Sequence, residues 1–232
     1  MGFFYMDQYY LLLVVPALIL SIFAQVKVKS TFNKYKAVRN SRNMTGAEVA
    51  SYLLQTNGIH DVQVTRTAGE LTDHYDPRRK VLRLSDSVFA STSVSAIGVA
   101  AHETGHAIQH HTSYAPLVLR STLVPVANIG SSAGPYIAVL GLFFGSPLIT
   151  YIGLFLFAGA ILFYLITLPV EFNASSRAIA SLRSTGLLTN DEIKPAKKVL
   201  SAAAMTYVAS ALVAVASFLR LLLITRNRQG RR

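Results

Sequence analysis

Four long apolar stretches alternate with polar segments along the chain. They are Tyr9–Val26, Leu117–Phe144, Leu148–Leu168 and Val199–Ile224. The first, third and fourth have the apolar length, about 20 residues, that one bilayer crossing needs. The second contains prolines and small polar residues, which predict a kinked or partly interfacial helix. Gly145-Ser146-Pro147 predicts a turn before the third stretch. The pattern therefore predicts a mainly α membrane protein with several transmembrane helices.

The polar segment after the first stretch has two helical patterns. Thr45 is expected to cap a helix, because Glu48 completes a capping box and Asn57-Gly58 supplies an end signal. A second helix is expected from about Ser93 to His111, where small and apolar residues recur.

Strand patterns lie between these two helices. Val62–Thr65 alternates like a short strand. Leu71–Tyr75 and Lys80–Leu84 flank Asp76-Pro77-Arg78-Arg79, which predicts a small β-hairpin. The segment is therefore expected to fold as an α+β domain outside the membrane.

These patterns divide the chain into five parts. We expect an N-terminal transmembrane anchor at residues 1–26, a cytoplasmic domain at 27–116, a transmembrane helical hairpin at 117–168, a second cytoplasmic segment at 169–198, and a C-terminal transmembrane helix with a basic tail at 199–232.

Charge sets the expected orientation of these parts. Six Lys and Arg residues lie between positions 27 and 43 and five between 171 and 198, but none between 121 and 170. The positive-inside tendency therefore places both polar segments in the cytoplasm. Residues 1–8 lack Lys and Arg, which favours an uncleaved anchor over a signal peptide. The C-terminal arginines conflict with a fourth crossing, so either the last stretch does not fully span or its tail is an exception; they are Arg226, Arg228, Arg231 and Arg232.

Composition narrows the possible partners. The net charge is +11, but the basic residues flank apolar runs and no nucleic-acid-binding pattern is present. We therefore expect contact with the lipid bilayer and no nucleic acid. The chain has no cysteine, so any zinc must be held by His, Asp or Glu side chains.

A zinc motif lies within the second predicted helix. His102, Glu103 and His106 form the pattern H-E-x-x-H. Residues four apart on a helix point about 40° apart, so both imidazoles can bind one tetrahedral Zn²⁺ ion. The carboxylate of Glu103 would lie beside the ion, where it can take a proton from an attacking water.

A catalytic zinc requires a third protein ligand. Glu171 is the best candidate, because it follows the third apolar stretch on the expected cytoplasmic side, with Pro169 suited to the first turn of a new helix. To share an ion with His102, it must lie on the same side of the membrane. The chain between them must therefore cross an even number of times, as the predicted hairpin does.

Other possible ligands remain downstream of His106. His110 lies about 12 Å along the helix axis from His102, so it and His111 are expected to interact with the carbonyls at the helix end. Asp191 and Glu192 resemble the acidic first turn of another helix, and a first-turn charge is also the alternative role for Glu171. The extended H-E-x-x-H-x-x-G-x-x-H form is excluded, because Gln109 and Thr112 occupy its last two defined positions.

The chain resembles the YugP-like neutral zinc metallopeptidases, a bacterial membrane family. The resemblance covers nearly the whole length, and the blocks that carry it are Val26–Tyr35, Met44–Ala50, Leu71–Pro77, the His102 motif, Tyr114–Arg120 and Leu168–Ser175. It implies a multi-pass protein of the bacterial cell membrane, with a zincin-like domain that hydrolyses peptide bonds.

The layout also resembles membrane proteases of the heat-shock and prenyl-protein-processing type. Their third ligand is the glutamate of an E-F-x-A-D segment, a position that Glu171 occupies here. The final aspartate can orient a zinc histidine, but this chain has Ser175 there. Asn173 or Asp73 could instead orient His102.

In zincin-type folds an extended substrate often adds to a strand near the active helix, which fits the predicted hairpin. His74 or Tyr75 on that hairpin could donate a hydrogen bond to the developing oxyanion, or the pair could simply flank the turn.

The sequence thus predicts a membrane-embedded zinc metalloendopeptidase. Its substrates would be peptides or proteins, above all membrane proteins or their cytoplasmic segments. Two other interpretations remain open. One is a catalytically inactive zinc-binding membrane scaffold, which would not need Glu103. The other is a basic lipid- or nucleic-acid-binding protein, which would leave the motif at His102 without a purpose.

Overall fold

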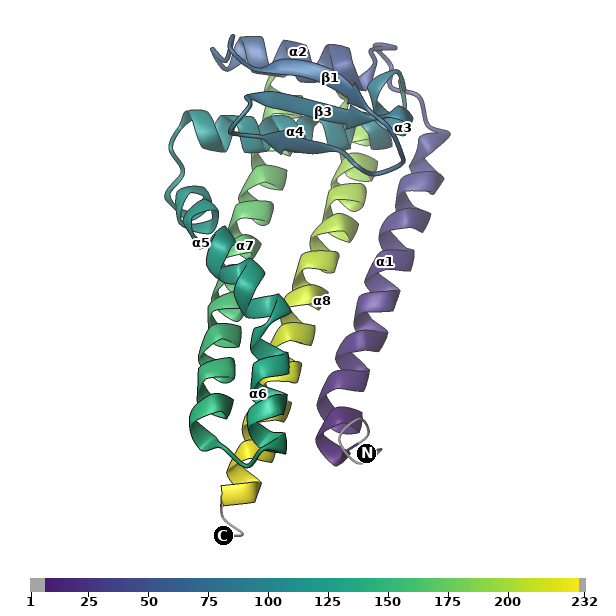
Figure 1. The fold of residues 1–232 in the computed structure, drawn as a ribbon. Coiled ribbons are helices and arrows are strands. Elements are labelled where there is room, and N and C mark those ends of the chain that lie inside the picture. The colour runs from purple at the N-terminus through teal and green to yellow at the C-terminus, as the bar shows by residue number, and fades with distance from the viewer. Residues whose placement is uncertain (1–6, 230–232) are drawn as a thin grey trace. The chain divides into compact units, whose positions relative to one another are not determined.

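The computed structural model describes residues 7–229 and divides into two compact units. Unit 1 comprises Met1–Gln25, Leu119–Leu168 and Thr206–Arg232, and unit 2 comprises Val26–Val118 and Pro169–Met205. The fold is mainly α with a small β region, as expected (Figure 1). Among the described residues, four helical segments are long and apolar enough to cross a membrane.

Long helices supply unit 1, and α1 (Val15–Lys36), α7 (Pro147–Ser184) and α8 (Asn190–Gln229) among them continue into unit 2. A short π-helical segment, Tyr10–Val14, leads into α1. The remaining helices are α5 (Ala115–Ser132) and α6 (Gly134–Phe143). The second apolar stretch is therefore broken between α5 and α6, beside a proline at the start of α6. This break agrees with the predicted kink.

Helices α6 and α7 pack closely as an antiparallel pair. A Cβ atom added to Gly141 would lie 2.3 Å from the backbone nitrogen of Thr150, and one added to Gly153 would lie 2.2 Å from that of Ala138. Only glycine permits such an approach of two backbones, a common device where membrane helices meet. The chain between residues 119 and 168 therefore returns along unit 1 as a hairpin.

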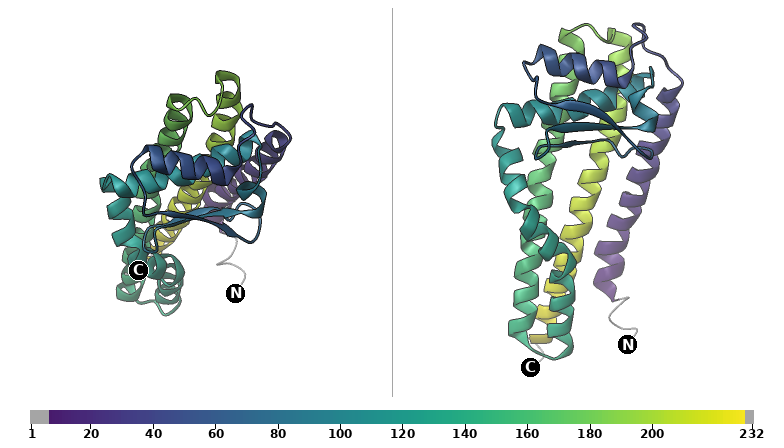
Figure 2. Two further views of the ribbon diagram at one scale, coloured as in Figure 1. Left: turned by 90° about the horizontal axis from the view of Figure 1, so that it is seen from above. Right: turned by 45° about the horizontal axis from the view of Figure 1, so that its top comes forward.

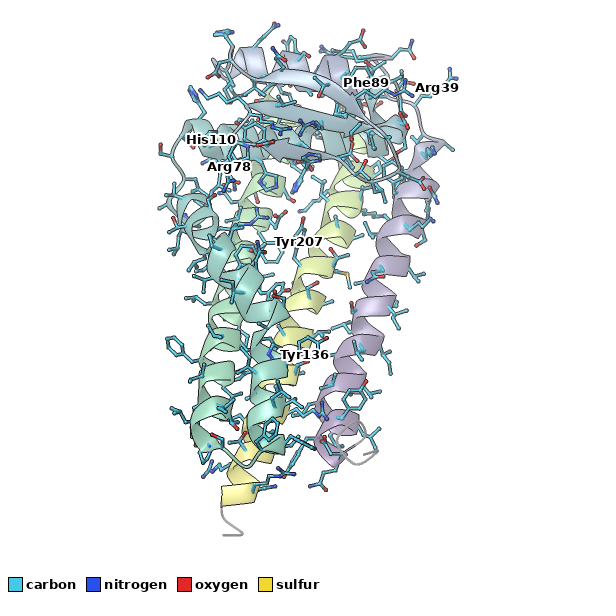
Figure 3. All side chains as sticks on the ribbon, viewed as in Figure 1. Arg39, Arg78, Phe89, His110, Tyr136 and Tyr207 are labelled. Atoms are coloured by element: carbon cyan, nitrogen blue, oxygen red, sulfur yellow. The ribbon has the colours of Figure 1, made fainter. Side chains whose placement is uncertain are left out.

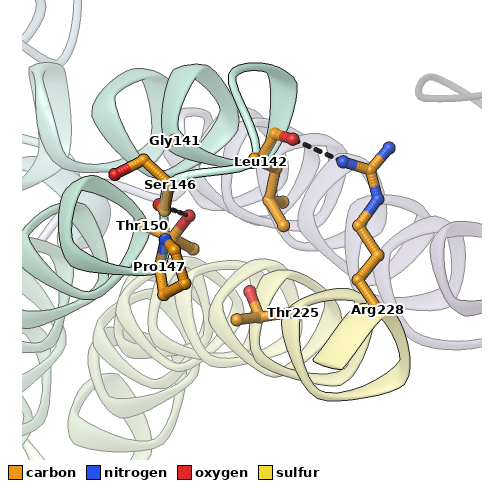
Figure 4. A pocket seen from close by; sticks show the side chains of 8 residues that line it. Gly141, Leu142, Ser146, Pro147, Thr150, Thr225 and Arg228 are labelled. Atoms are coloured by element: carbon orange, nitrogen blue, oxygen red, sulfur yellow. Dashed lines mark hydrogen bonds between the residues drawn. The ribbon is translucent and has the colours of Figure 1, made fainter. Parts of the chain in front are cut away.

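The far end of α8 lies beside the start of the first apolar helix. Arg220 forms an ion pair with Asp7, with 2.7 Å between Nη2 and Oδ2, and Asn227 donates to the Tyr9 hydroxyl at 2.6 Å. Arg228 donates to the carbonyl oxygen of Leu142 at the edge of a cavity of about 40 Å³ (Figure 4). Helix α8 is thus anchored near its C-terminal end within unit 1, and it is long and apolar enough for a fourth crossing. Arg231 and Arg232 of the basic tail lie outside the described residues.

The strands of unit 2 form one small sheet, visible in the right-hand view of Figure 2. Its strands β1 (Gln63–Thr67), β2 (His74–Asp76) and β3 (Val81–Ser85) have the order β1-β3-β2. Strands β2 and β3 are antiparallel and form the predicted hairpin, although β2 is shorter than expected. Strand β1 pairs with β3 in parallel. Strand β2 is consequently one of the two edges of the sheet.

Helices α2 (Gly46–Thr56), α3 (Asp86–Phe89) and α4 (Val94–His111) complete unit 2. The capping box of Thr45 and Glu48 is present, and the Ser93 hydroxyl accepts a hydrogen bond from the backbone N–H of Ala96 in the first turn of α4. Leu82 and Leu84 of β3 are fully buried and pack with residues of α2 and α4. Helix α4 therefore lies against the inner face of the sheet and also contacts β2.

One boundary prediction was wrong. Pro169 does not begin a helix but lies inside α7, which continues without interruption from Pro147 to Ser184. A proline in a helix interior removes one backbone hydrogen bond and usually kinks or ends the helix, which is why the sequence predicted a boundary. Glu171 is accordingly an interior residue of a long helix and not a first-turn charge.

Candidate metal centre

Three side chains meet between α4 and α7 within unit 2. The Nε2 atoms of His102 and His106 lie 3.3 Å and 3.5 Å from the same oxygen, Oε2 of Glu171. The side chains are largely buried, with 13%, 12% and 3% of their surface exposed. Among residues 7–229, this is the group of His and acidic side chains whose ligand atoms all lie within 4.8 Å of one another. The expected ligand set is therefore brought together.

The spacing of these atoms fits a tetrahedral zinc ion. Zn–N and Zn–O bonds of about 2.1 Å at tetrahedral angles put neighbouring ligand atoms about 3.4 Å apart. Both distances from Glu171 to the imidazoles agree with that value. Two neutral imidazoles and one carboxylate are also a ligand set that catalytic zinc uses. The residues present therefore fit the metal that the sequence predicts.

The two helices reach this geometry because glycine lets them approach closely. A Cβ atom at Gly105 would lie 2.5 Å from the carbonyl oxygen of Ala174 on α7. Gly105 directly precedes His106, and Ala174 is three residues from Glu171. The close contact thus fixes the separation between the imidazole pair and the carboxylate.

Glu103 lies beside the ligands and is only 8% exposed. Burial raises the pKa of its carboxyl, whereas the positive potential of His102 and His106 acts in the opposite direction. Within residues 7–229 its carboxylate accepts no hydrogen bond and forms no ion pair, and neither oxygen is completely shielded from solvent. A carboxylate in this state can accept a hydrogen bond from a water molecule, as a general base must.

His106 has a perturbed pKa for a different reason. Burial by itself would lower the pKa of the imidazole, but its hydrogen bond to Glu171 and the negative charge of that residue raise it above the ordinary value. The carboxylate of Glu171 thus favours a positive charge at the His106 imidazole.

Each imidazole has a partner at its other nitrogen. Nδ1 of His102 lies 3.1 Å from the Ser175 hydroxyl, and Nδ1 of His106 lies 3.0 Å from Oε1 of Gln109. From the sequence, Asn173 or Asp73 could orient His102. In the structure both side chains bond to other residues. Asn173 accepts from Gln109 and from an arginine, whereas Asp73 accepts from the backbone and hydroxyl of Ser85.

Neither partner was predicted, although local spacing points to both. Ser175 lies four residues after Glu171, and Gln109 lies three residues after His106, so each shares a helix face with a ligand.

The two hairpin candidates point in different directions. The Tyr75 hydroxyl lies 2.8 Å from Nδ1 of His110 at the end of α4, where Figure 3 labels that histidine. His74 is exposed, and its ring nitrogens lie near the carbonyl of Thr72 and the guanidinium of Arg83. Successive strand residues face opposite sides of a sheet, so only Tyr75 faces α4.

The other candidate ligands lie outside the His102, His106 and Glu171 group. His110 and His111 form the last turn of α4, as expected, but His110 contacts Tyr75. Asp191 and Glu192 lie in the first turn of α8, as predicted, and bond to Lys194 and Ser41 respectively.

Comparison with known proteins places this centre in context. Residues 10–226 match the profile of a family described as "Putative neutral zinc metallopeptidase". The chain is 50% identical over 218 residues to "Putative membrane protease YugP" of Bacillus subtilis (strain 168), an alignment covering 94% of this chain and 97% of the relative. No solved structure matches the chain. The matched family and the His102, His106 and Glu171 cluster both indicate zinc. Since both matches cover almost the whole chain, the protein belongs to this YugP-like family of neutral zinc metallopeptidases.

Proposed function

We propose that the protein hydrolyses peptide bonds at a zinc centre held by His102, His106 and Glu171. The observation that carries this proposal is the convergence of three ligand atoms, spaced as a tetrahedral ion requires, beside the buried carboxylate of Glu103. A structural zinc site needs no such carboxylate. The rival interpretation, an inactive zinc-binding scaffold, leaves Glu103 unexplained.

The residues of the chain have distinct tasks in this reaction. Zinc bound at the site would polarise the scissile carbonyl and lower the pKa of a water toward about 7. Glu103 accepts the proton of the attacking water and later delivers it to the leaving amine.

The edge strand β2 is the proposed docking position for the substrate. An extended peptide can add to a free sheet edge through main-chain hydrogen bonds. Tyr75 on this strand faces the catalytic helix, so we assign oxyanion stabilisation to its hydroxyl, held by His110. His74, the other candidate, lies on the opposite face and is proposed to contribute only to the hairpin.

The proposed substrates are membrane proteins or their cytoplasmic segments. The four apolar helices, the distribution of Lys and Arg, and the name of the Bacillus subtilis relative support a multi-pass protein of the cell membrane with its active site toward the cytoplasm. Both chain segments that form the metal site flank the hairpin of residues 119–168, as an even number of crossings requires.

Three variants test the chemistry in purified, zinc-loaded protein. Glu103→Gln should retain zinc but lose at least about 100-fold in kcat, because general acid–base catalysis contributes about that much. Glu171→Gln should weaken zinc binding by more than roughly 10–100-fold. That range is the cost of losing a residue that only orients a ligand, whereas Glu171 is itself a proposed ligand. Glu70→Gln, which changes an exposed glutamate, is the control.

Zinc content and peptide cleavage are the two readouts. Zinc binding without cleavage in the wild type, unaffected by Glu103→Gln, would favour the scaffold. Equal cleavage of soluble and membrane-anchored peptides would contradict the proposed substrate class.

A further inference from the structure

Gln109 is a fully buried polar side chain of α4 whose amide is bonded on both sides. Its Nε2 lies 2.8 Å from the carbonyl oxygen of Val170 and 3.0 Å from Oδ1 of Asn173. Its Oε1 lies 3.0 Å from Nδ1 of His106. Both donors of the amide thus point toward α7, and its acceptor points toward the metal ligand.

The chemistry of the partners fixes this direction. A backbone carbonyl can only accept a hydrogen bond, so the Gln109 atom beside Val170 must be the amide nitrogen. Arginine can only donate, and Nε of Arg177 lies 2.8 Å from Oδ1 of Asn173. Oδ1 of Asn173 is therefore an acceptor, and it accepts from Gln109 as well. Both constraints leave Oε1 as the atom that faces His106.

The orientation of Gln109 determines where His106 carries its proton. Because Oε1 has no hydrogen to give, Nδ1 of His106 must be the donor. A neutral imidazole has one N–H, so Nε2 retains its lone pair. Nε2 is the atom that lies 3.5 Å from Glu171 at the metal centre.

We propose that Val170, Asn173 and Arg177 act through Gln109 as a positioning relay that holds His106 in the form protonated at Nδ1. In the neutral imidazole the relay keeps the proton on Nδ1 and leaves the lone pair on Nε2, the atom that faces the metal centre. It rests on the proposed function only in that Nε2 is taken as the zinc-binding atom.

Two further contacts support the relay. The Arg177 guanidinium lies over the Tyr114 ring, with 5.9 Å between Cζ and the ring centroid. Within residues 7–229 the Arg177 guanidinium pairs with no carboxylate, and its Nε–H donates to Asn173. His102 provides a contrast, because its partner is the Ser175 hydroxyl, which can either donate or accept. Gln109 therefore sets the proton position at His106, whereas the hydroxyl of Ser175 is compatible with either proton position at His102.

Replacing Gln109 with methionine tests the proposal, since this side chain has a similar shape but makes none of the three bonds. Zinc affinity, measured by competition with a chelator, should fall by roughly 10–100-fold. Histidine-selective nitrogen NMR of the metal-free protein at alkaline pH should show His106 protonated at Nδ1 in the wild type and a mixture of both forms in the variant.

A second pair of variants tests the outer part of the relay. Asn173→Asp still accepts from both Gln109 and Arg177, so zinc affinity should stay at the wild-type value. Asn173→Leu accepts from neither and should weaken zinc binding. Arg177→Met should act in the same direction as Asn173→Leu, whereas Arg183→Met, an exposed arginine of the same helix, should have no effect.

An unchanged His106 proton position, or unchanged zinc affinity, in folded Gln109→Met would overturn the proposal. If that variant does not fold, equal zinc affinity of Asn173→Asp and Asn173→Leu would overturn it instead. The NMR measurement requires neither metal nor cleavage. A wild type that binds zinc but cleaves no peptide would therefore refute the proposed function and leave the relay intact.

Discussion

Replacing Gly105 with alanine tests whether the contact between α4 and α7 sets the metal geometry. The added Cβ would lie 2.5 Å from the carbonyl oxygen of Ala174, about 0.9 Å short of the 3.4 Å at which ordinary contact begins. A backbone carbonyl inside a helix cannot rotate away. Relief therefore requires α7 to move, and Glu171 would move with it.

The size of this displacement decides the expected effect. Zinc–ligand distances tolerate deviations of only about 0.2 Å. A shift several times larger should reduce zinc affinity at least as much as losing a residue that orients a ligand, roughly 10–100-fold. Intrinsic helix propensity acts in the opposite direction, because alanine favours a helix over glycine by about 1 kcal/mol. A loss in Gly105→Ala must therefore come from the steric contact.

Gly98 of the same helix supplies a matched control. A Cβ atom there would lie 3.5 Å from the Cβ of Ala196, an ordinary contact. Gly98→Ala should bind zinc like the wild type and unfold at an equal or higher temperature. Zinc titration against a chelator and thermal unfolding in detergent measure both properties. Wild-type zinc affinity in Gly105→Ala would refute the reasoning.

Three further outcomes are expected. Ser175→Asp should tighten zinc binding, and Ser175→Ala should weaken it, because a carboxylate forms a stronger hydrogen bond with the Nδ1–H of His102 than a hydroxyl does; chelator competition measures both. Tyr75→Phe should lower kcat while zinc content stays constant, and an unchanged kcat would remove Tyr75 from the mechanism. The Thr45 backbone N–H holds the pKa of Glu48 below its ordinary value, so this carboxylate stabilises the fold above its unfolded-state pKa and the stabilisation is lost as pH falls. Melting temperatures should therefore favour the wild type over Glu48→Gln at neutral pH, with the difference disappearing in acid.

Several features could be predicted because they depend on neighbours in the sequence. The spacing of His102 and His106 places both imidazoles on one helix face wherever that helix lies. Apolar length likewise predicts the spanning helices, and the capping box of Thr45 predicts the start of α2. In each case one turn of helix or one uninterrupted stretch contains all the necessary information.

The end of the third apolar helix shows the limit of such reasoning. A proline after an apolar run predicts a boundary, but α7 continues through Pro169 and carries Glu171 on its interior turns. Proline in a membrane helix is tolerated where neighbouring groups satisfy the backbone that it leaves free. Whether such neighbours exist depends on how other helices pack against α7, and this cannot be predicted from the residues around Pro169.

The sequence by itself determined the histidine pair on one helix face, the position of the proposed general base and the spanning segments, and it ranked Glu171 first among the remaining acids. Only the tertiary structure decided that Glu171 meets the imidazoles, that Ser175 and Gln109 hold them, and that Gly105 sets the distance. The reason is physical. The pair lies within one helical turn, whereas Glu171 is 65 or more residues away, and its contact depends on how two helix backbones pack.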